Sequence, residues 1–187
     1  MMHKDRKSIA PELDVVAWLN TNEPITLAKL RGNIVVIHAF QMLCPGCVTH
    51  GIPQASAIHQ LYQQEKVEVI GLHTVFEHHN VMTADALKAF IHEYRVPFPI
   101  AIDTPCEKTG IPNTMAKYHM QGTPTLIILD KKGCIRLNHF GRMSDMQVGS
   151  IIGKLLEETD SMLKSSIDLK PSAPLRASEC DEDGCAI

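Results

Sequence analysis

Two cysteines, Cys44 and Cys47, stand three residues apart in the segment FQMLCPGCVTH at residues 40–50. Such a pair can close a disulfide, supply half of a metal site, or exchange electrons with other thiols. It follows an apolar run, IVVIHAF at residues 34–40, which has the composition of a buried strand. We therefore expect Cys44 to open a helix, where free backbone amides and the helix dipole favour the thiolate, and a more buried Cys47 to resolve the intermediate that Cys44 forms.

The surroundings of the pair favour redox exchange over its alternatives. Pro45 suits a first helical turn, because no backbone N–H is needed there. A zinc site could use His50, or Cys180 and Cys185, as further ligands, but the sequence holds no second C-x-x-C of the kind that structural zinc sites usually contain. A purely structural bridge would close a very short loop and stabilise little. We expect a redox pair with no metal and no cofactor, and keep metal binding as an alternative.

Composition limits the class of protein and its partners. The chain has 187 residues, 44% of them hydrophobic and 21% charged, which is typical of a soluble globular domain. A formal net charge of −3 gives no reason to expect a nucleic acid or anionic lipid as partner. The first residues, MMHKDRKSIAPELD, lack the apolar core of a signal peptide, and the apolar runs are too short to span a bilayer. We expect a cytoplasmic protein with no membrane partner.

Strand-like and helix-like segments alternate along the chain. The expected strands are 34–40, 67–75, 98–102, 125–130 and 134–140, and the expected helices are 44–65, 84–94, 112–120 and 144–163. Thr83 is the expected N-cap of the second helix, and Pro112 the first residue of the third. Two strand–helix–strand units followed by a hairpin and a helix predict a three-layer α/β domain with a mixed central sheet.

The composition changes near residue 164. The segment KSSIDLKPSAPLRASECDEDGCAI has proline, serine and acidic residues but little apolar periodicity, so we predict one domain at 1–163 and a flexible tail at 164–187. The tail carries a Cys-x4-Cys pair, Cys180 and Cys185, whose acidic neighbours make both thiols slow nucleophiles. A mobile dithiol can still relay electrons to another thiol pair. Loose metal binding is the alternative.

A proline that precedes a strand adds to the redox interpretation. In QGTPTLIIL, Thr123 and Pro124 stand just before the apolar run of a strand. A proline there can simply mark the start of the strand. Combined with a C-x-x-C at the end of an earlier strand, it predicts a cis-proline loop that faces the disulfide.

Residues 10–160 resemble the thioredoxin superfamily, and more closely its TlpA/ResA-like redoxin branch. The resemblance rests on APELD, ITLAKLRGNIVVIHAF, CPGC, VIGLHTV and AKYHMQGTPTLIILDKKGCI. It implies a thioredoxin-like fold with an N-terminal strand pair and a central insertion around 76–110. It also implies disulfide exchange through Cys44 and Cys47, and a substrate groove shaped by cis-Pro124, with Thr123 and Pro45 as further substrate-binding positions.

Departures from the family pattern bear on the mechanism. His38 stands six residues before Cys44, where thioredoxins commonly carry a buried acid, so we expect it to accept the proton of Cys47. The alternative is a strand histidine satisfied by a backbone partner. Peroxiredoxins, which share the fold, carry P-x-x-x-T-x-x-C, and this sequence has Ile37 and Gln41 at the Pro and Thr positions. That difference argues against peroxidase chemistry.

The expected function is therefore that of a thiol–disulfide oxidoreductase with an antioxidant role. Its expected partners are protein or low-molecular-weight disulfides and a thioredoxin-type or glutathione-type reductant. A thiol-dependent peroxidase and a non-enzymatic metal-binding protein of the same fold are the alternatives.

Overall fold

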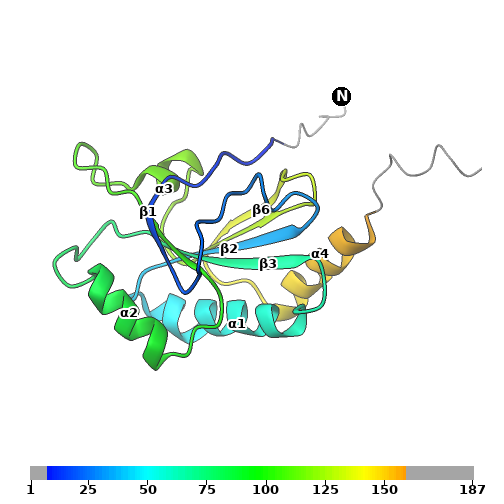
Figure 1. The fold of residues 1–187 in the computed structure, drawn as a ribbon, viewed down its shortest axis with the longest axis horizontal. Helices are drawn as coiled ribbons and strands as arrows, with labels where there is room; N and C mark the ends of the chain where they lie inside the picture. The colour runs from blue at the N-terminus through cyan, green and yellow to red at the C-terminus, as the bar shows by residue number, and fades with distance from the viewer. Residues whose placement is uncertain (1–7, 159–187) are drawn as a thin grey trace, which may run out of the picture.

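The computed structural model describes residues 8–158, which form one mixed sheet with helices on both faces (Figure 1). The strands are β1 (Val15–Leu19), β2 (Ile34–Phe40), β3 (Val67–His73), β4 (Ile100–Asp103), β5 (Thr125–Leu129) and β6 (Ile135–Phe140). The helices are a π-helical turn, η1 (Cys47–Gly51), followed by α1 (Ile52–Leu61), α2 (Ala84–Glu93), α3 (Asn113–Lys117) and α4 (Asp145–Glu157).

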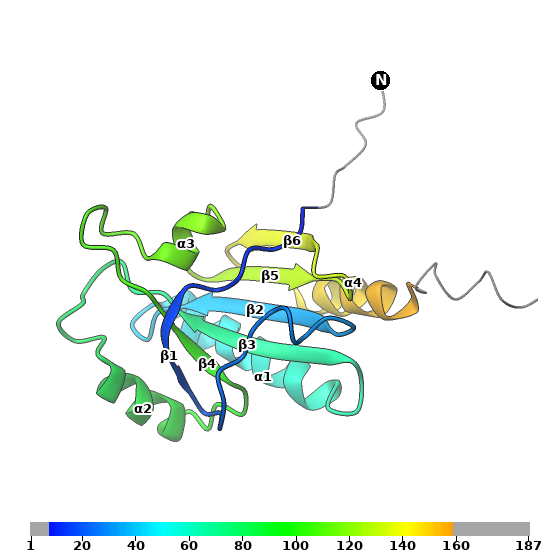
Figure 2. The same ribbon diagram turned by 45° about the horizontal axis from the view of Figure 1, so that its top comes forward.

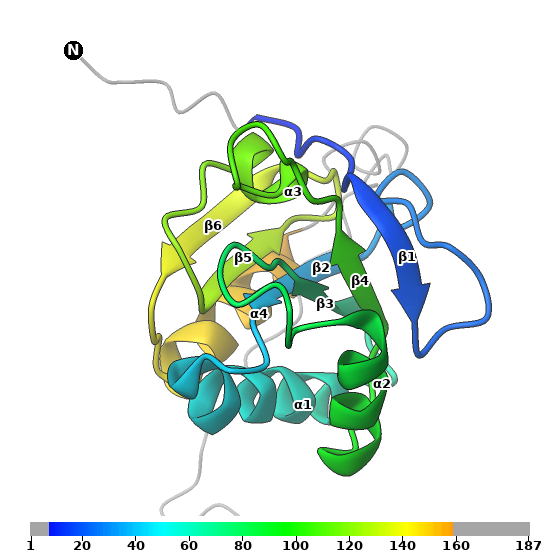
Figure 3. The ribbon, with the colours of Figure 1, turned by 90° about the vertical axis from the view of Figure 1, so that its left-hand side faces the viewer.

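The six strands lie in the order β1-β4-β3-β2-β5-β6 (Figure 2). Strands β2, β3 and β4 are parallel to one another, whereas β1, β5 and β6 each run antiparallel to the neighbour that they pair with. This arrangement confirms the predicted α/β fold with a mixed central sheet. Because β2, β3 and β4 are parallel, their carboxyl ends and the loops that follow them meet at one edge of the sheet (Figure 3).

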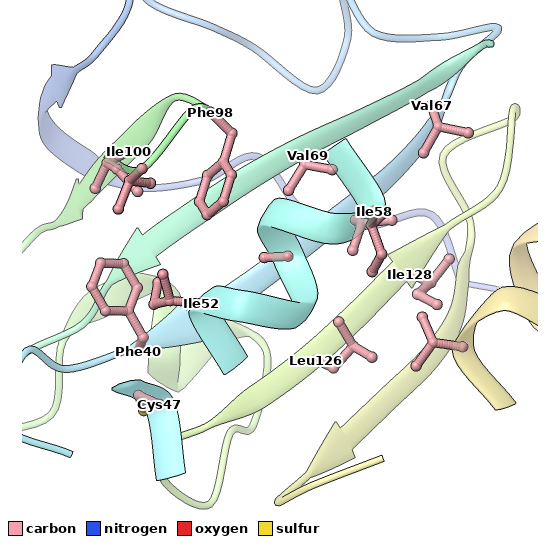
Figure 4. Packing of buried hydrophobic residues seen from close by; sticks show 14 of the residues in the cluster. Phe40, Cys47, Ile52, Ile58, Val67, Val69, Phe98, Ile100, Leu126 and Ile128 are labelled. Atoms are coloured by element: carbon pink, nitrogen blue, oxygen red, sulfur yellow. The ribbon is translucent and has the colours of Figure 1, made fainter. Parts of the chain in front are cut away.

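The sheet has an apolar core on each face. In β2 every residue is buried, and alternate side chains point to opposite faces: Ile34, Val36 and Phe40 to one, Val35 and Ile37 to the other. The first face is covered by α1, α2 and α4, and the second by α3 and the chain before β2 (Figures 3 and 4). Burying one such side chain stabilises the fold by about 1.5–3 kcal/mol. The continuous apolar character of this strand thus reflects burial on both sides.

The amino-terminal part differs from the expected strand pair. Within residues 8–158, β1 is the one strand that precedes β2, and it pairs with β4 rather than with a second amino-terminal strand. After β1 the chain leaves the sheet at Asn20, which has a φ of 57° and donates hydrogen bonds from Nδ2 to Val96 O and Phe98 O, both at 2.9 Å. The stretch 76–110 supplies α2 and β4, and β4 provides the edge to which β1 adds.

Several element boundaries also differ from the prediction. The helix expected at 44–65 begins with a π-helical turn and ends at Leu61, because Tyr62 leaves helical geometry. Pro112 is the N-cap of α3 rather than its first residue, since its ψ of 151° is extended. The Thr83 cap of α2 is confirmed by a bond from Ala86 N–H to Oγ1 of 3.3 Å. Helix α4 ends at Glu157, so the predicted boundary at 163 and the tail with Cys180 and Cys185 lie outside the described residues.

Candidate active site

Cys44 lies just beyond the carboxyl end of β2, at the start of the helical segment that leads into α1. It is half-buried, and its Sγ accepts a hydrogen bond of 3.3 Å from the backbone N–H of Cys47. Its thiol also reaches Thr123 O at 3.5 Å. An amide from the first helical turn therefore points at the Cys44 sulfur, as the sequence predicts, and an amide in that position stabilises negative charge on sulfur.

Cys47 differs from Cys44 in its environment. Its side chain is fully buried, at 0% exposure, inside the core between α1 and the sheet (Figure 4). Burial, and secondly a hydrogen bond with Cys44, raises the pKa of Cys47 to about 12, although contacts with the Gln41 backbone and the Thr123 side chain act in the opposite direction. Both cysteines are free thiols. The Cys47 thiol is therefore protonated at neutral pH and shielded from outside reagents.

Pro124 lies against the dithiol segment from the other side. The Thr123–Pro124 peptide bond is cis. A Cβ placed on Gly46, between the two cysteines, would lie 3.3 Å from Pro124 Cδ, so the two segments are in close contact at this glycine. The predicted cis bond and its orientation toward the cysteines are thus confirmed. The proposed roles of Thr123, Pro124 and the exposed Pro45 in substrate binding stay predictions.

His38 is on β2 beneath η1, at 3% exposure. Its Nδ1 lies 3.5 Å from Thr125 O, and because a carbonyl only accepts, this contact assigns the proton to Nδ1. Nε2, a lone-pair acceptor in this tautomer, has no hydrogen-bond partner within residues 8–158. Burial lowers the pKa of His38 to about 4, so the ring is neutral at pH 7. No hydrogen bond joins His38 to Cys47 in the described part of the chain, which leaves its predicted proton transfer without the direct contact that it requires.

Instead, Nε2 of His38 faces Gly51, one turn after Cys47. A Cβ on Gly51 would overlap the imidazole, so glycine is needed for the helix to lie this close to β2. Both residues line a cavity of about 330 Å³ that extends to Pro124. At its rim Arg142 Nη1 donates to His50 Nε2 at 3.3 Å. The dithiol is thus flanked by a hollow that could receive part of a substrate.

One residue that organises the site was not expected from the sequence to do so. Gln41, at 1% exposure, donates from Nε2 to Glu77 Oε1 at 3.2 Å and accepts from Phe76 N–H at 3.3 Å. Its backbone oxygen accepts from Cys44 N–H at 3.2 Å. Gln41 therefore joins the dithiol segment to the loop after β3. The sequence signal for this role was a polar residue directly after a buried strand. In the sequence analysis Gln41 counted only against peroxidase chemistry.

The described residues contain neither a metal-binding cluster nor a membrane-spanning helix. Among residues 8–158, no group of three or more histidine, cysteine, aspartate or glutamate side chains is arranged to hold a metal ion. Within the same range, no helix combines the length and apolar character needed to cross a bilayer.

The comparisons with known proteins define the class. The model of the AhpC/TSA family matches residues 7–138, and the chain belongs to that family. A solved thioredoxin-like superfamily protein is 52% identical, with a TM-score of 0.78 over 81% of this chain and 97% of that one. The fold is therefore thioredoxin-like, as the resemblance implied.

Individual relatives are similar over different shares of their length. The structure of a thiol-disulfide isomerase from Corynebacterium glutamicum is 51% identical, with a TM-score of 0.79 over 83% of this chain and 99% of that one. Sporulation thiol-disulfide oxidoreductase A of Bacillus subtilis is 25% identical, over 63% of this chain and 66% of that protein. NHL repeat-containing protein 2 of Gallus gallus is 27% identical over 94% of this chain, which spans only 25% of that much longer relative.

Proposed function

We propose that this protein is a thiol–disulfide oxidoreductase in which Cys44 attacks and Cys47 resolves. The observation that carries the proposal is the asymmetry of the pair. The sulfur of half-buried Cys44 accepts the Cys47 amide, whereas Cys47 is fully buried and its pKa is raised to about 12. The chain's similarity to a thiol-disulfide isomerase from Corynebacterium glutamicum and to a thiol-disulfide oxidoreductase from Bacillus subtilis supports the same chemistry.

The reaction proceeds in two exchanges. The Cys44 thiolate attacks one sulfur of a substrate disulfide, forming a mixed disulfide and releasing the other substrate sulfur as a thiolate. The Cys47 thiol then loses its proton and attacks Cys44 Sγ, which releases the second substrate thiol and leaves a Cys44–Cys47 disulfide. An external dithiol then reduces the Cys44–Cys47 disulfide to two thiols and is itself oxidised to a disulfide. Because the pKa of Cys47 is high, the second exchange depends on proton removal and is the slower one.

The proposal extends to substrates, location and branch. Exposed apolar side chains flank the pair: Leu43 precedes Cys44, and the Phe140 ring lies near Gly122, next to the cis-proline loop. Such a surface favours protein disulfides over fully hydrophilic small ones. We assign the protein to the TlpA/ResA-like branch, with a cytoplasmic location, an antioxidant role and a thioredoxin-type or glutathione-type reductant. This assignment rests on the sequence features described above.

Trapping of the mixed disulfide tests the mechanism. The Cys47→Ser variant should accumulate a covalent adduct with insulin, which contains disulfides, because its second exchange is blocked. The matched control is the Cys44→Ser, Cys47→Ser double variant, which should form no adduct at this site. If Cys44→Ser alone traps substrate as efficiently as Cys47→Ser, the roles of the two cysteines are reversed. If no single variant traps substrate, the proposed activity is wrong.

A further inference from the structure

The loops that follow β3 and β4 lie at the same edge of the sheet (Figure 3). Residues of these loops line a second hollow. It consists of two cavities of about 360 and 190 Å³ that share Val75, His79 and Pro105 and are therefore contiguous. The larger cavity is lined by Cys106 and the smaller by His73. None of these residues takes part in the proposed exchange at Cys44 and Cys47, and we call the joined hollow the β3–β4 groove.

The floor of the groove contains a buried histidine. His73, the last residue of β3, is 2% exposed, and its ring packs on Phe40 with centroids 5.3 Å apart. Its Nε2 has no hydrogen-bond partner within residues 8–158. A buried polar nitrogen without a partner is uncommon, and a ligand atom that reached Nε2 from the smaller cavity would supply the missing hydrogen bond. Asp103, which also lines the groove, is already paired with Thr74 Oγ1 at 2.8 Å.

The other end of the groove contains a thiol in an activating environment. Cys106 is half-buried in the loop after β4 and is a free cysteine. Hydrogen bonds from the Thr109 hydroxyl, and then from the backbone amides of Thr109 and Lys108, lower the pKa of Cys106. These donors stabilise the thiolate, which is the nucleophilic form.

We propose that the β3–β4 groove binds low-molecular-weight disulfides and that Cys106 accepts half of such a molecule as a mixed disulfide. The Cys106 thiolate attacks one sulfur of R–S–S–R, the S–S bond breaks, and a new bond joins Cys106 Sγ to RS while RS⁻ leaves. The protein thiol is oxidised and the departing sulfur is reduced, so no other oxidant is required. Among residues 8–158, Cys106 is the one cysteine that lines the groove, so the adduct has no neighbouring thiol in this part of the chain to release it.

The walls of the groove indicate an uncharged organic substituent. The apolar residues lining the cavity above His73 are Val16, Val75, Met82, Ala84, Ile102 and Pro105. Burial lowers the pKa of His73 to about 4, so the imidazole is neutral at pH 7 and offers a hydrogen bond but no charge. A hollow that is largely apolar and has a few polar groups is typical of sites for small ligands, and the polar residues here are His73, His79, Asp103 and Glu107. A negatively charged disulfide would lose its hydration there and would meet the carboxyl groups of Asp103 and Glu107.

Reaction kinetics with two probes test the site. The probes are dipyridyl disulfide, which is neutral and aromatic, and oxidised glutathione, which is charged. The protein is the full chain carrying Cys44→Ser and Cys47→Ser. Tryptic fragments 96–108 and 133–136 contain Cys106 and Cys134 separately, so mass spectrometry follows each thiol in one sample. Cys134 is the internal control, since it is half-buried but lines neither cavity.

A binding site and a merely exposed thiol give different concentration dependences. We expect the rate at Cys106 to saturate with dipyridyl disulfide, and to exceed that at Cys134 by about tenfold or more at low probe. With oxidised glutathione, and at Cys134 with either probe, the rate should rise linearly. A linear dependence at Cys106 with dipyridyl disulfide overturns the proposal, because the thiol then reacts without a bound complex.

Two pairs of variants locate the bound probe. Val16 lines the groove from the exposed edge strand, whereas Ala17 next to it is exposed and does not. Val16→Lys should raise the half-saturating concentration about fivefold or more, since it places a charge on an apolar wall, while Ala17→Lys should leave it within about twofold. His79→Asn should act like Val16→Lys, with His78→Asn as its control. If members of either pair behave alike, the probe is not bound in the groove.

Cys106→Ser, with Cys44 and Cys47 intact, should leave disulfide exchange at Cys44 and Cys47 unchanged, so the proposed function is tested independently.

Discussion

His38 and His73 lie in neighbouring strands and are buried to a similar degree, but the two rings adjoin different cavities. Both are nearly fully buried, burial lowers the pKa of each to about 4, and Nε2 of each has no hydrogen-bond partner within residues 8–158. His38 is oriented by the Thr125 carbonyl and covered by Gly51 of the dithiol helix. His73 packs on the Phe40 ring and lines the β3–β4 groove, which Cys106 also lines.

The two sides of the edge differ in whether a second cysteine lies close enough to release a mixed disulfide. The His38 side of the edge has two cysteines one helical turn apart, so a mixed disulfide formed there has an internal nucleophile to release it. Within residues 8–158 the His73 side has Cys106 alone, so a mixed disulfide formed there has no partner thiol beside it to release it. One edge of the sheet thus combines a site for turnover with a site for retention.

The largest expected effect separates these two thiols. Cys44→Ser should lower insulin disulfide reduction by about 10²-fold or more, because the attacking nucleophile is lost. Cys106→Ser should change the same rate by less than about twofold, since retention at Cys106 does not contribute to turnover. Turnover with dithiothreitol as electron donor, measured for both variants, makes the comparison. If Cys106→Ser lowers the rate of insulin reduction nearly as much as Cys44→Ser does, the two thiols belong to one site and the comparison is wrong.

The second prediction uses the property that the two histidines share. A histidine with a pKa of about 6.5 when unfolded and about 4 when buried is neutral in the fold, so protonation favours the unfolded chain. The stabilisation is complete above pH 6.5 and is lost as pH falls toward 4, by on the order of 3 kcal/mol for each histidine. Urea unfolding across that range should show a steep loss. His38→Gln and His73→Gln should each remove about half of it, and exposed His92→Gln almost none. Equal slopes in all three variants would show that neither buried histidine controls acid stability.

A third prediction concerns Gly51, the glycine that lies directly against the His38 ring. Gly51→Ala places a methyl group on the imidazole and should destabilise the fold by about 1–3 kcal/mol. Gly149→Ala, in the middle of α4 with no atom near its Cβ position, should stabilise it by up to about 1 kcal/mol through helix propensity. Combining Gly51→Ala with His38→Ala should recover part of the loss, because the overlap disappears. Chemical denaturation of these three variants and of His38→Ala gives the four values; additive losses in the double variant would refute the contact.

The sequence predicts most of the fold because its local signals agree. The apolar runs of β2, β3 and β5, and the Thr83 cap, all appear as expected. The partner of β1 could not be inferred, since an exposed edge strand with a mixed pattern carries no mark of the strand that it joins. The redox pair and its cis-proline are local motifs as well. The roles of Gln41 and Gly51, and the groove between the loops after β3 and β4, depend on contacts between segments far apart in the chain.

A fourth prediction concerns the catalytic contribution of His38. A base with a pKa of about 4 takes a proton from a thiol with a pKa of about 12 only against a steep gradient, and the two residues share no hydrogen bond. We therefore expect His38→Gln to slow release of the mixed disulfide by less than about tenfold, below the 10²–10⁴-fold typical of a positioned general base. Rapid-quench analysis separates attack from release, with His73→Gln as the control. Slowing of release alone by 10²-fold or more would restore His38 as the proton acceptor.

The smallest effect is expected from the tail. Helix α4 begins at the cavity beside the dithiol, where Asp145 is one of the lining residues, and its 13 residues carry the chain about 20 Å along the sheet before Glu157 (Figure 1). About 22 residues separate Glu158 from Cys180. A flexible chain of that length, as its composition predicts for the tail, spans about 25 Å root-mean-square, so Cys180 and Cys185 could return to Cys44 but would spend little time there.

Their acidic neighbours slow the attack further, and an external dithiol in excess should outcompete them. Truncation after residue 170 should therefore change turnover with excess dithiothreitol by less than about twofold. The Cys180→Ser, Cys185→Ser full-length variant is the matched control, because it removes the thiols but keeps the chain. A relay predicts that both variants slow re-reduction of the Cys44–Cys47 disulfide equally when external thiol is scarce. A larger loss in the truncated protein than in the serine variant would assign the tail a contact with the domain that does not involve its thiols.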